Sequence, residues 1–173
     1  MKKKKNSESY ISLKDVRGLI SSIRSARDKL MLRILYESGC SLVELVEIKV
    51  SDISGNKIKI HHGKLRFSSV SGKLAKDIRE YIKGNQLSAN TYLISTRQSN
   101  KISEKRVRQL ILGYTKINPQ KFRYFHIAHA YLNGVFIENI AKQIGLTTYR
   151  IFQILNNMGL APQNRYNQFL KRI

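Results

Sequence analysis

The stretch "QKFRYFHIAHAYLNGVFIENIAKQIGLTTYRIFQIL", residues 120–155, decides the fold of this chain. Its first half has helical spacing. His126 and His129 are three residues apart, so both side chains would leave the same face of a helix, one turn after Arg123. Two histidines so placed are typical of a metal site, but a metal needs further ligands, and nothing in the sequence places the histidines of residues 61–62 nearby. The first half is therefore interpreted as a helix, and no metal or other cofactor is predicted.

The second half of the stretch has the cadence of a helix-turn-helix. A helix with Ala141 at the close contact leads through Gly145 into a second helix that starts at Thr147. In such a motif the start of the second helix faces a groove or the phosphates of DNA. Short helix pairs are equally common in all-α cores, so both interpretations stay open at this point. The side chains that would face the DNA are Thr147, Thr148, Tyr149, Arg150 and Gln153.

The balance of charge points to a polyanionic partner. The 173 residues include 32 Lys and Arg against 11 Asp and Glu, a formal net charge of +21, and 42% of them are hydrophobic, which is enough for one folded domain. A compact domain tolerates such self-repulsion best beside a polyanion. Double-stranded DNA is the leading candidate, since each neutralised phosphate releases counterions. RNA ranks last, because the aromatic residues are not arranged as stacking platforms on a sheet.

Membrane insertion and export are disfavoured. No apolar run approaches the ~20 residues that span a bilayer, and no signal-peptide core follows the N-terminal lysines. An anionic membrane surface competes with DNA only as a docking partner. The single Cys40 excludes an internal disulfide and fits a reducing cytoplasm. We therefore expect a cytoplasmic protein that does not enter a membrane.

The remaining sequence predicts a mainly α (α+β) domain with one small sheet. Residues 1–10, which begin "MKKKKNSES", are expected to form a basic flexible tail, either solvated or resting on DNA, and residues 11–173 a single domain. Serine caps and apolar spacing predict helices, and alternating patterns around Gly63-Lys64 predict a β-hairpin. The predicted helices cover residues 12–23, 26–39, 42–48, 72–84 and 103–116 and three or four segments after Pro119, with hairpin strands at 57–62 and 65–70 and a small strand at 91–95.

Four segments of the chain share their pattern with one known family. They are "ISLKDVRGLISSI" with "ARDKLMLRILYESGCSLVELVEIKVSDI", the hairpin Gly-Lys pair with "SSVSGKLAKDIREYI", "YLISTRQSNKISEKRVRQLI", and "FRYFHIAHAYLNGVFIENIAKQIGL". In this order the segments resemble the catalytic domain of the tyrosine recombinases, the phage integrase family. The resemblance covers nearly the whole chain from about Ile11 and makes the helix-turn-helix cadence one part of a larger domain. It also leads us to expect no N-terminal core-binding domain in this chain.

The resemblance implies a particular chemistry. Members of the family attack a phosphodiester of DNA with a tyrosine, forming a 3′-phosphotyrosine and freeing a 5′-hydroxyl. They need that nucleophile, two arginines whose forked donors hold the non-bridging oxygens, and a lysine as general acid, but no metal. In this sequence the hairpin lysine falls on Lys64 and the second arginine on Arg123, and both are present.

Four other family positions have lost their functional group. They are Ser41 for the first arginine, Gln120 for the histidine of His-x-x-Arg, Leu146 for the histidine after the Leu-Gly pair, and Leu155 for the tyrosine. Losing one oxyanion donor typically costs about 10²–10³ in rate, so a deficient active site is expected. Tyr149, six residues too early, and Tyr166, eleven residues too late, are the remaining candidates for a nucleophile.

Three functions stay open. The first is a DNA-binding protein with the recombinase fold that is deficient in strand cleavage, the second an active but diverged site-specific tyrosine recombinase or integrase, and the third a helix-turn-helix DNA-binding regulator. Self-association on DNA is open in each case. Eleven residues are predicted to contact DNA. The basic ones other than Lys64 and Arg123 are expected to be solvated charges that position the duplex without reading its sequence. The full set is Lys64, Arg66, Arg97, Lys105, Arg106, Arg108, Lys121, Arg123, Thr147, Thr148 and Arg150.

Overall fold

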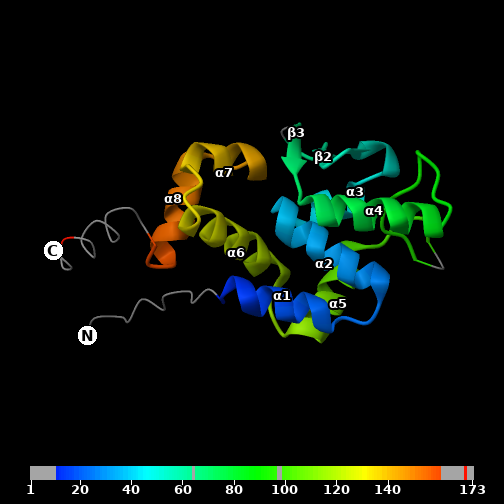
Figure 1. The fold of residues 1–173 in the computed structure, drawn as a ribbon, viewed down its shortest axis with the longest axis horizontal. Helices are drawn as coiled ribbons and strands as arrows, with labels where there is room; N and C mark the ends of the chain where they lie inside the picture. Colours follow the sequence, from blue (N-terminus) through cyan, green and yellow to red (C-terminus); the bar gives the residue numbers. More distant parts are fainter. Residues whose placement is uncertain (1–10, 64, 97–98, 161–169, 171–173) are drawn as a thin grey trace.

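The computed structural model describes residues 11–63, 65–96, 99–160 and 170. Within these ranges the chain is mainly helical with a small antiparallel sheet, as the sequence predicted (Figure 1). The helices are α1 (Leu13–Ser22), α2 (Ala26–Ser38), α3 (Leu42–Glu47), α4 (Gly72–Gly84), α5 (Glu104–Thr115), α6 (Pro119–Leu132), α7 (Ile137–Ile144) and α8 (Thr148–Asn157). A 3-10 turn, η1 (Val50–Asp52), precedes the strands β1 (Ile53–Ser54), β2 (Lys57–Ile60) and β3 (Arg66–Ser69).

Serine caps fix where the helices of the first two thirds begin. The helices α1 to α5 each follow a serine whose hydroxyl accepts a hydrogen bond from the backbone N–H of the third helical residue. Such a cap satisfies one of the N–H groups that the first turn leaves without a partner, and it is worth about 1 kcal/mol. The predicted starts of these helices are confirmed. The caps are Ser12, Ser25, Ser41, Ser71 and Ser103.

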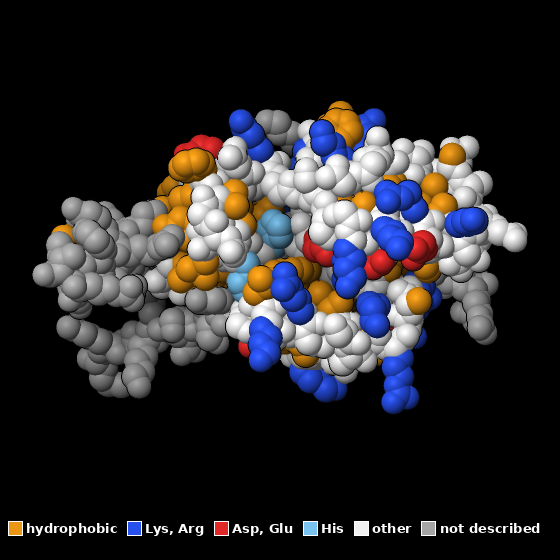
Figure 2. All heavy atoms as spheres, in the orientation of Figure 1, with side chains coloured by type: hydrophobic (Ala, Val, Ile, Leu, Met, Phe, Trp, Pro, Cys, Tyr) orange, Lys and Arg blue, Asp and Glu red, His pale blue; other side chains and the backbone are white. Residues whose placement is uncertain are grey.

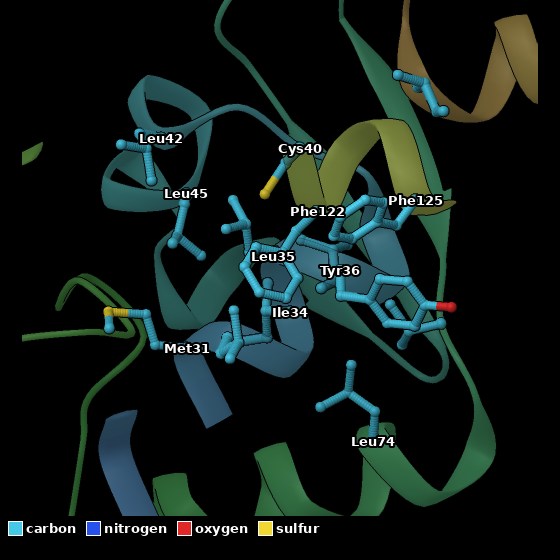
Figure 3. Close-up of a cluster of buried hydrophobic side chains, with 14 of the residues drawn as sticks. Met31, Ile34, Leu35, Tyr36, Cys40, Leu42, Leu45, Leu74, Phe122 and Phe125 are labelled. Atoms are coloured by element: carbon cyan, nitrogen blue, oxygen red, sulfur yellow. The ribbon is translucent and has the colours of Figure 1, made fainter. Parts of the chain in front are cut away.

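Helix α2 is the centre of the core. It packs against α1, α3, α4 and α6, and also against β3. Figure 3 shows Met31, Ile34 and Leu35 of α2 gathered with Phe122 and Phe125 of α6, and all five side chains are buried. The two phenylalanine rings meet edge to face, with centroids 5.7 Å apart. Because α2 and α6 are locked together, the end of one and the start of the other have fixed positions.

The predicted hairpin is confirmed, and a short third strand joins it. Strand β2 pairs antiparallel with both neighbours, so the order is β1-β2-β3. In the register, Ile60 lies opposite Arg66 and Lys57 opposite Ser69. On β3 the burial alternates, and the side chains of Arg66 and Ser68 point inward. The alternation therefore turns the charged side chain of Arg66 toward the interior, where it meets Glu44.

The predicted strand at residues 91–95 is wrong. This segment forms a single antiparallel bridge, between Tyr92 and Lys49. Its backbone groups are hydrogen-bonded to the turn after α3. Val50 N donates to Thr91 O at 3.0 Å, and Leu93 N donates to Ile48 O at 2.8 Å. The apolar run is buried against the core without an extended partner, and this explains why its pattern imitates a strand.

The helix pair at the end of the described chain matches the predicted cadence. Helix α7 ends at Gly145, which has a left-handed φ of 75°, and α8 begins after the cap Thr147. Ala141 of α7 is buried, and α7 packs against α8. Both helices also pack on α6, so the pair is part of the larger domain rather than a separate motif.

Candidate functional site

A small pocket, called here the α3–α6 pocket, lies where the end of α2 and the starts of α3 and α6 meet α5. Its volume is about 190 Å³. Ser41 lines it from the start of α3, Gln120 and Arg123 from the first turns of α6, and Glu104 and Arg108 from α5. The structure therefore brings together three of the positions that the family resemblance assigned to a phosphate site.

Both the hydroxyl and the backbone N–H of Ser41 are used to cap the start of α3. Its hydroxyl accepts a bond from Glu44 N at 3.3 Å, and its own N–H donates to Glu44 Oε2 at 2.7 Å, which makes a complete capping box. A hydroxyl so engaged offers no charged fork to a phosphate. The pocket therefore lacks the donor that an arginine at this position would supply.

Arg123 forms the inner wall of the pocket. Its Nη2 donates to Ile144 O at 2.8 Å, and its Nη1 lies 3.7 Å from Glu44 Oε2. Its Nε is buried and has no hydrogen-bond partner within the part of the chain that the structure describes. Burial lowers the pKa of the guanidinium, and the Glu44 charge opposes this. Internal contacts thus fix the position of the Arg123 side chain, and its Nε–H stays buried without a partner in the described part of the chain.

Arg66 is not the solvated phosphate contact that the sequence predicted. Its side chain is 9% exposed, with Nη1 2.5 Å from Glu44 Oε1 and Nε donating to Gln143 O at 3.2 Å. The Cα of Gly145 lies directly against it, since a Cβ added there would be 2.8 Å from Arg66 Nη1. Long-range pairing with Glu44 turned this residue inward, and no local pattern in the sequence signals that contact.

Glu44, Arg66 and Arg123 form one buried cluster, called here the Glu44 cluster. Burial alone would raise the pKa of Glu44. The bonds from Arg66 and from the Ser41 N–H, together with the charges of both arginines, hold it below its usual value. The two guanidiniums also reach the last carbonyls of α7, which carry the negative end of the helix dipole. The cluster therefore joins α3, β3, α6 and α7.

The two histidines of the opening stretch belong to the core side of α6. His129 Nδ1 bonds to the Tyr36 hydroxyl at 2.7 Å, and His129 Nε2 bonds to Ile11 O at 2.8 Å. Burial lowers the pKa of His126 to about 4 and raises that of Tyr36 to about 12. Within the described ranges, no group of three or more His, Cys, Asp or Glu side chains could hold a metal ion.

The nucleophile candidates do not reach the α3–α6 pocket in the described part of the chain. Leu155 is 0% exposed, and Leu146 packs against the core. Tyr149 is 69% exposed, but no described tyrosine lines the pocket. Tyr166, together with Lys64 and Arg97, lies outside the described residues. Cys40 does line the pocket, but burial raises the pKa of its thiol to about 11, which keeps it protonated and unreactive.

The other predicted contact residues are mostly at the surface. Lys105, Arg106 and Arg108 are exposed on α5, and Lys121 is partly buried on α6. At the start of α8, Thr147, Thr148 and Arg150 are exposed, and Arg150 also bonds to Gln153 at 3.1 Å.

The sequence did not reveal two grooves with charged linings. One, of about 720 Å³, is lined by the cations Arg17, Lys29, Arg33 and Lys73 and by the acids Glu37 and Asp77. Figure 2 shows Lys and Arg side chains gathered with a few acids over the face of α2 and α4, where this groove lies. In the other, of about 640 Å³, Lys49 lies over the ring of Tyr92. The charges of both grooves come from several elements, so no single stretch of sequence marks them.

A mainly helical domain with a hairpin sheet, and with an arginine of α6 facing the start of α3, has the architecture of a tyrosine recombinase catalytic domain. The chain belongs to the phage integrase family, whose family model matches residues 9–156. Tyrosine recombinase XerA of Pyrococcus horikoshii is 28% identical over 153 residues, covering 80% of this chain and 54% of that protein. Tyrosine recombinase XerC of Staphylococcus epidermidis is 26% identical over 136 residues, covering 70% and 46%. The chain thus spans about half the length of these curated relatives.

Solved structures confirm the fold. XerA recombinase superposes with a TM-score of 0.79 at 19% identity, over 95% of this chain and 65% of that one. The catalytic domain of bacteriophage HP1 integrase gives a TM-score of 0.61 at 18% identity, over 89% of both chains. XerH recombinase bound to its difH substrate gives 0.69 at 16% identity, over 88% and 51%. None of the described helices is long and apolar enough to cross a membrane.

Proposed function

We propose that this protein binds double-stranded DNA with the recombinase fold and is deficient in strand cleavage. The second part is supported by the state of two positions that the resemblance assigns to the family's tyrosine and first arginine. Leu155, at the first, is fully buried, and Ser41, at the second, is occupied in a capping box. A leucine has no group that can attack phosphorus, and a capping hydroxyl cannot hold the developing charge.

Binding itself is supported by charge and position. Part of the +21 formal charge lies on Lys105, Arg106 and Arg108, which are exposed on α5 beside the α3–α6 pocket. Arg123 lines this pocket, and 14% of its side chain is exposed. Relatives with this fold, including XerH, have been solved with DNA. A surface of this kind holds a duplex mainly by contacts to its phosphates.

The test combines two measurements on the full chain. Fluorescence anisotropy with a labelled duplex should give an affinity that falls steeply with salt, with a slope of about −0.9 for each phosphate contacted. A nicked suicide duplex, which traps cleaved intermediates, should give no covalent protein–DNA band on a denaturing gel. No duplex binding at low salt would refute the proposal, and a covalent band would refute its second part.

An active recombinase is the alternative that the exposed hydroxyl of Tyr149 favours. In that case the covalent band appears, and either Tyr149→Phe or Tyr166→Phe abolishes it. Since the two variants keep the aromatic ring, loss of the band in only one of them identifies the nucleophile directly.

A helix-turn-helix regulator is favoured by the exposed start of α8. It predicts sequence-specific binding that is lost on substitution within residues 147–153 and is unaffected by Lys64→Ala. The recombinase-like interface predicts weaker binding in Lys64→Ala with every duplex sequence, because a phosphate contact carries no sequence information.

A further inference from the structure

The α3–α6 pocket contains a second guanidinium that is not one of the family positions. Arg108, on α5, lines the same pocket as Arg123 and Ser41. Its side chain is exposed, and no ion pair or hydrogen bond of Arg108 occurs in the ranges that the structure describes. The guanidinium is therefore available to a ligand, unlike that of Arg66, whose Nη1 and Nε are already bonded inside the protein.

The pocket suits one phosphate group. Its volume of about 190 Å³ leaves room for one tetrahedral anion with some water. The Glu44 cluster carries two arginines against one glutamate, and together with Arg108 it outweighs Glu104 on the lining, so the pocket keeps a positive balance. Two forked cations are the usual way to hold the non-bridging oxygens of a phosphodiester.

We propose that Arg108 supplies the second guanidinium of the pocket, so that Arg108 and Arg123 together hold one backbone phosphate of the bound duplex. The arginine that Ser41 does not provide at the start of α3 is in effect provided from α5. This inference rests on the proposed function, because the ligand is a phosphate of the duplex. It assigns Arg108 to binding and not to catalysis.

The first test is duplex affinity measured by anisotropy, with Arg108→Ala compared with a matched control, Arg106→Ala. Both arginines are exposed on α5, but only Arg108 lines the pocket. Losing a charged hydrogen bond to phosphate should weaken binding by about tenfold or more in Arg108→Ala, against roughly two- to threefold in the control. Arg108→Lys, which keeps the charge without the fork, should fall between them. Equal losses in Arg108→Ala and Arg106→Ala would overturn the inference.

A second measurement tests whether the two arginines share one ligand. In ¹⁵N NMR spectra, dimethyl phosphate should shift the side-chain Nε–H signals of Arg108 and Arg123 along one common binding curve, and leave that of Arg106 in place. In Arg123→Lys, the shift of the Arg108 signal should need several times more dimethyl phosphate. Separate curves, or an unchanged Arg108 curve in that variant, would contradict a shared phosphate.

The outcomes separate this inference from the proposed function. If the unaltered protein does not bind duplex DNA, the proposed function fails and the phosphate of the pocket has another source, which the dimethyl phosphate titration still detects. If the protein binds DNA but Arg108→Ala behaves like Arg106→Ala, only the role of Arg108 is refuted.

Discussion

The Glu44 cluster and the exposed face of α5 use the same type of residue in opposite ways. In the cluster, Arg66 and Arg123 are packed against one carboxylate and against the carbonyls at the end of α7. On α5, Arg106 and Arg108 extend into solvent. Formal charge alone does not separate the two groups. Arg66, whose Nη1 and Nε are bonded inside the protein, stabilises the fold, whereas the exposed cations of α5 remain to attract a polyanion. Arg123 belongs to the cluster and also lines the α3–α6 pocket.

The largest expected effect comes from breaking the cluster at its shared carboxylate. Glu44→Ala leaves two buried guanidiniums without their counter-charge, and it also removes half of the Ser41 capping box. The free energy of unfolding should fall by roughly 3–5 kcal/mol. Urea denaturation followed by circular dichroism measures it. Glu47→Ala is the control, since Glu47 is only half-buried and its ion pair with Lys101 is partly exposed, and it should cost less than about 1 kcal/mol.

A smaller effect should follow from crowding Arg66. Gly145→Ala puts a methyl group 2.8 Å from Arg66 Nη1 at a residue with φ of 75°. Gly159→Ala imposes the same kind of backbone strain, with φ of 72°, but has open space around it. We expect a loss of roughly 2–3 kcal/mol in the first variant and about 1 kcal/mol in the second. Equal losses would mean that the contact with Arg66 is unimportant.

The next prediction concerns His126, a partly buried base on α6. Burial lowers the pKa of His126 from 6.5 to about 4. Between these two pH values the imidazole is protonated in the unfolded chain but stays neutral in the folded chain. Stability should therefore fall as pH decreases from about 6.5 toward 4, by roughly 1 kcal/mol per pH unit from this residue. His126→Phe should reduce the slope by that amount in denaturation series at pH 7, 6 and 5. His62→Gln, at an exposed hairpin position, should leave the slope as it is.

The smallest expected effect concerns the exposed cations. Arg150→Ala removes an exposed charge at the start of α8 and should change the free energy of unfolding by less than about 0.5 kcal/mol. If Arg150 contacts a phosphate, the slope of log affinity against log salt should fall by about one unit. Lys76→Ala removes an exposed charge from α4, where it is paired with Glu80, and should not change that slope. A similar change in both variants would show that the duplex responds only to total charge.

The sequence predicted those features that depend on neighbouring residues. Serine caps and apolar spacing located the helices, and the alternation around Gly63 located the hairpin. The burial of Arg66 was not predicted, because its partner Glu44 lies 22 residues away and the pairing exists only in the folded chain. The segment at residues 91–95 was misread for a related reason, since its partners belong to the turn after α3.

The candidate site was also predicted only in part. Matching the family pattern brought Ser41, Gln120 and Arg123 to one pocket, as the structure has them. It gave no reason to single out Arg108 among the exposed cations, because α5 joins the pocket only through tertiary packing. A family pattern locates the family's own positions, whereas coordinates are needed to find other residues, such as Arg108, that line the same pocket.

On the proposed function, the capping box at Ser41 opposes the return of an arginine to this position. A mutation to arginine at this position would remove the hydroxyl that starts α3, and losing such a cap costs about 1 kcal/mol. A lineage that gained this arginine would thus pass through a less stable intermediate unless stabilising changes had accumulated first. The need to cap α3 at this one residue therefore constrains which substitutions evolution can accept there.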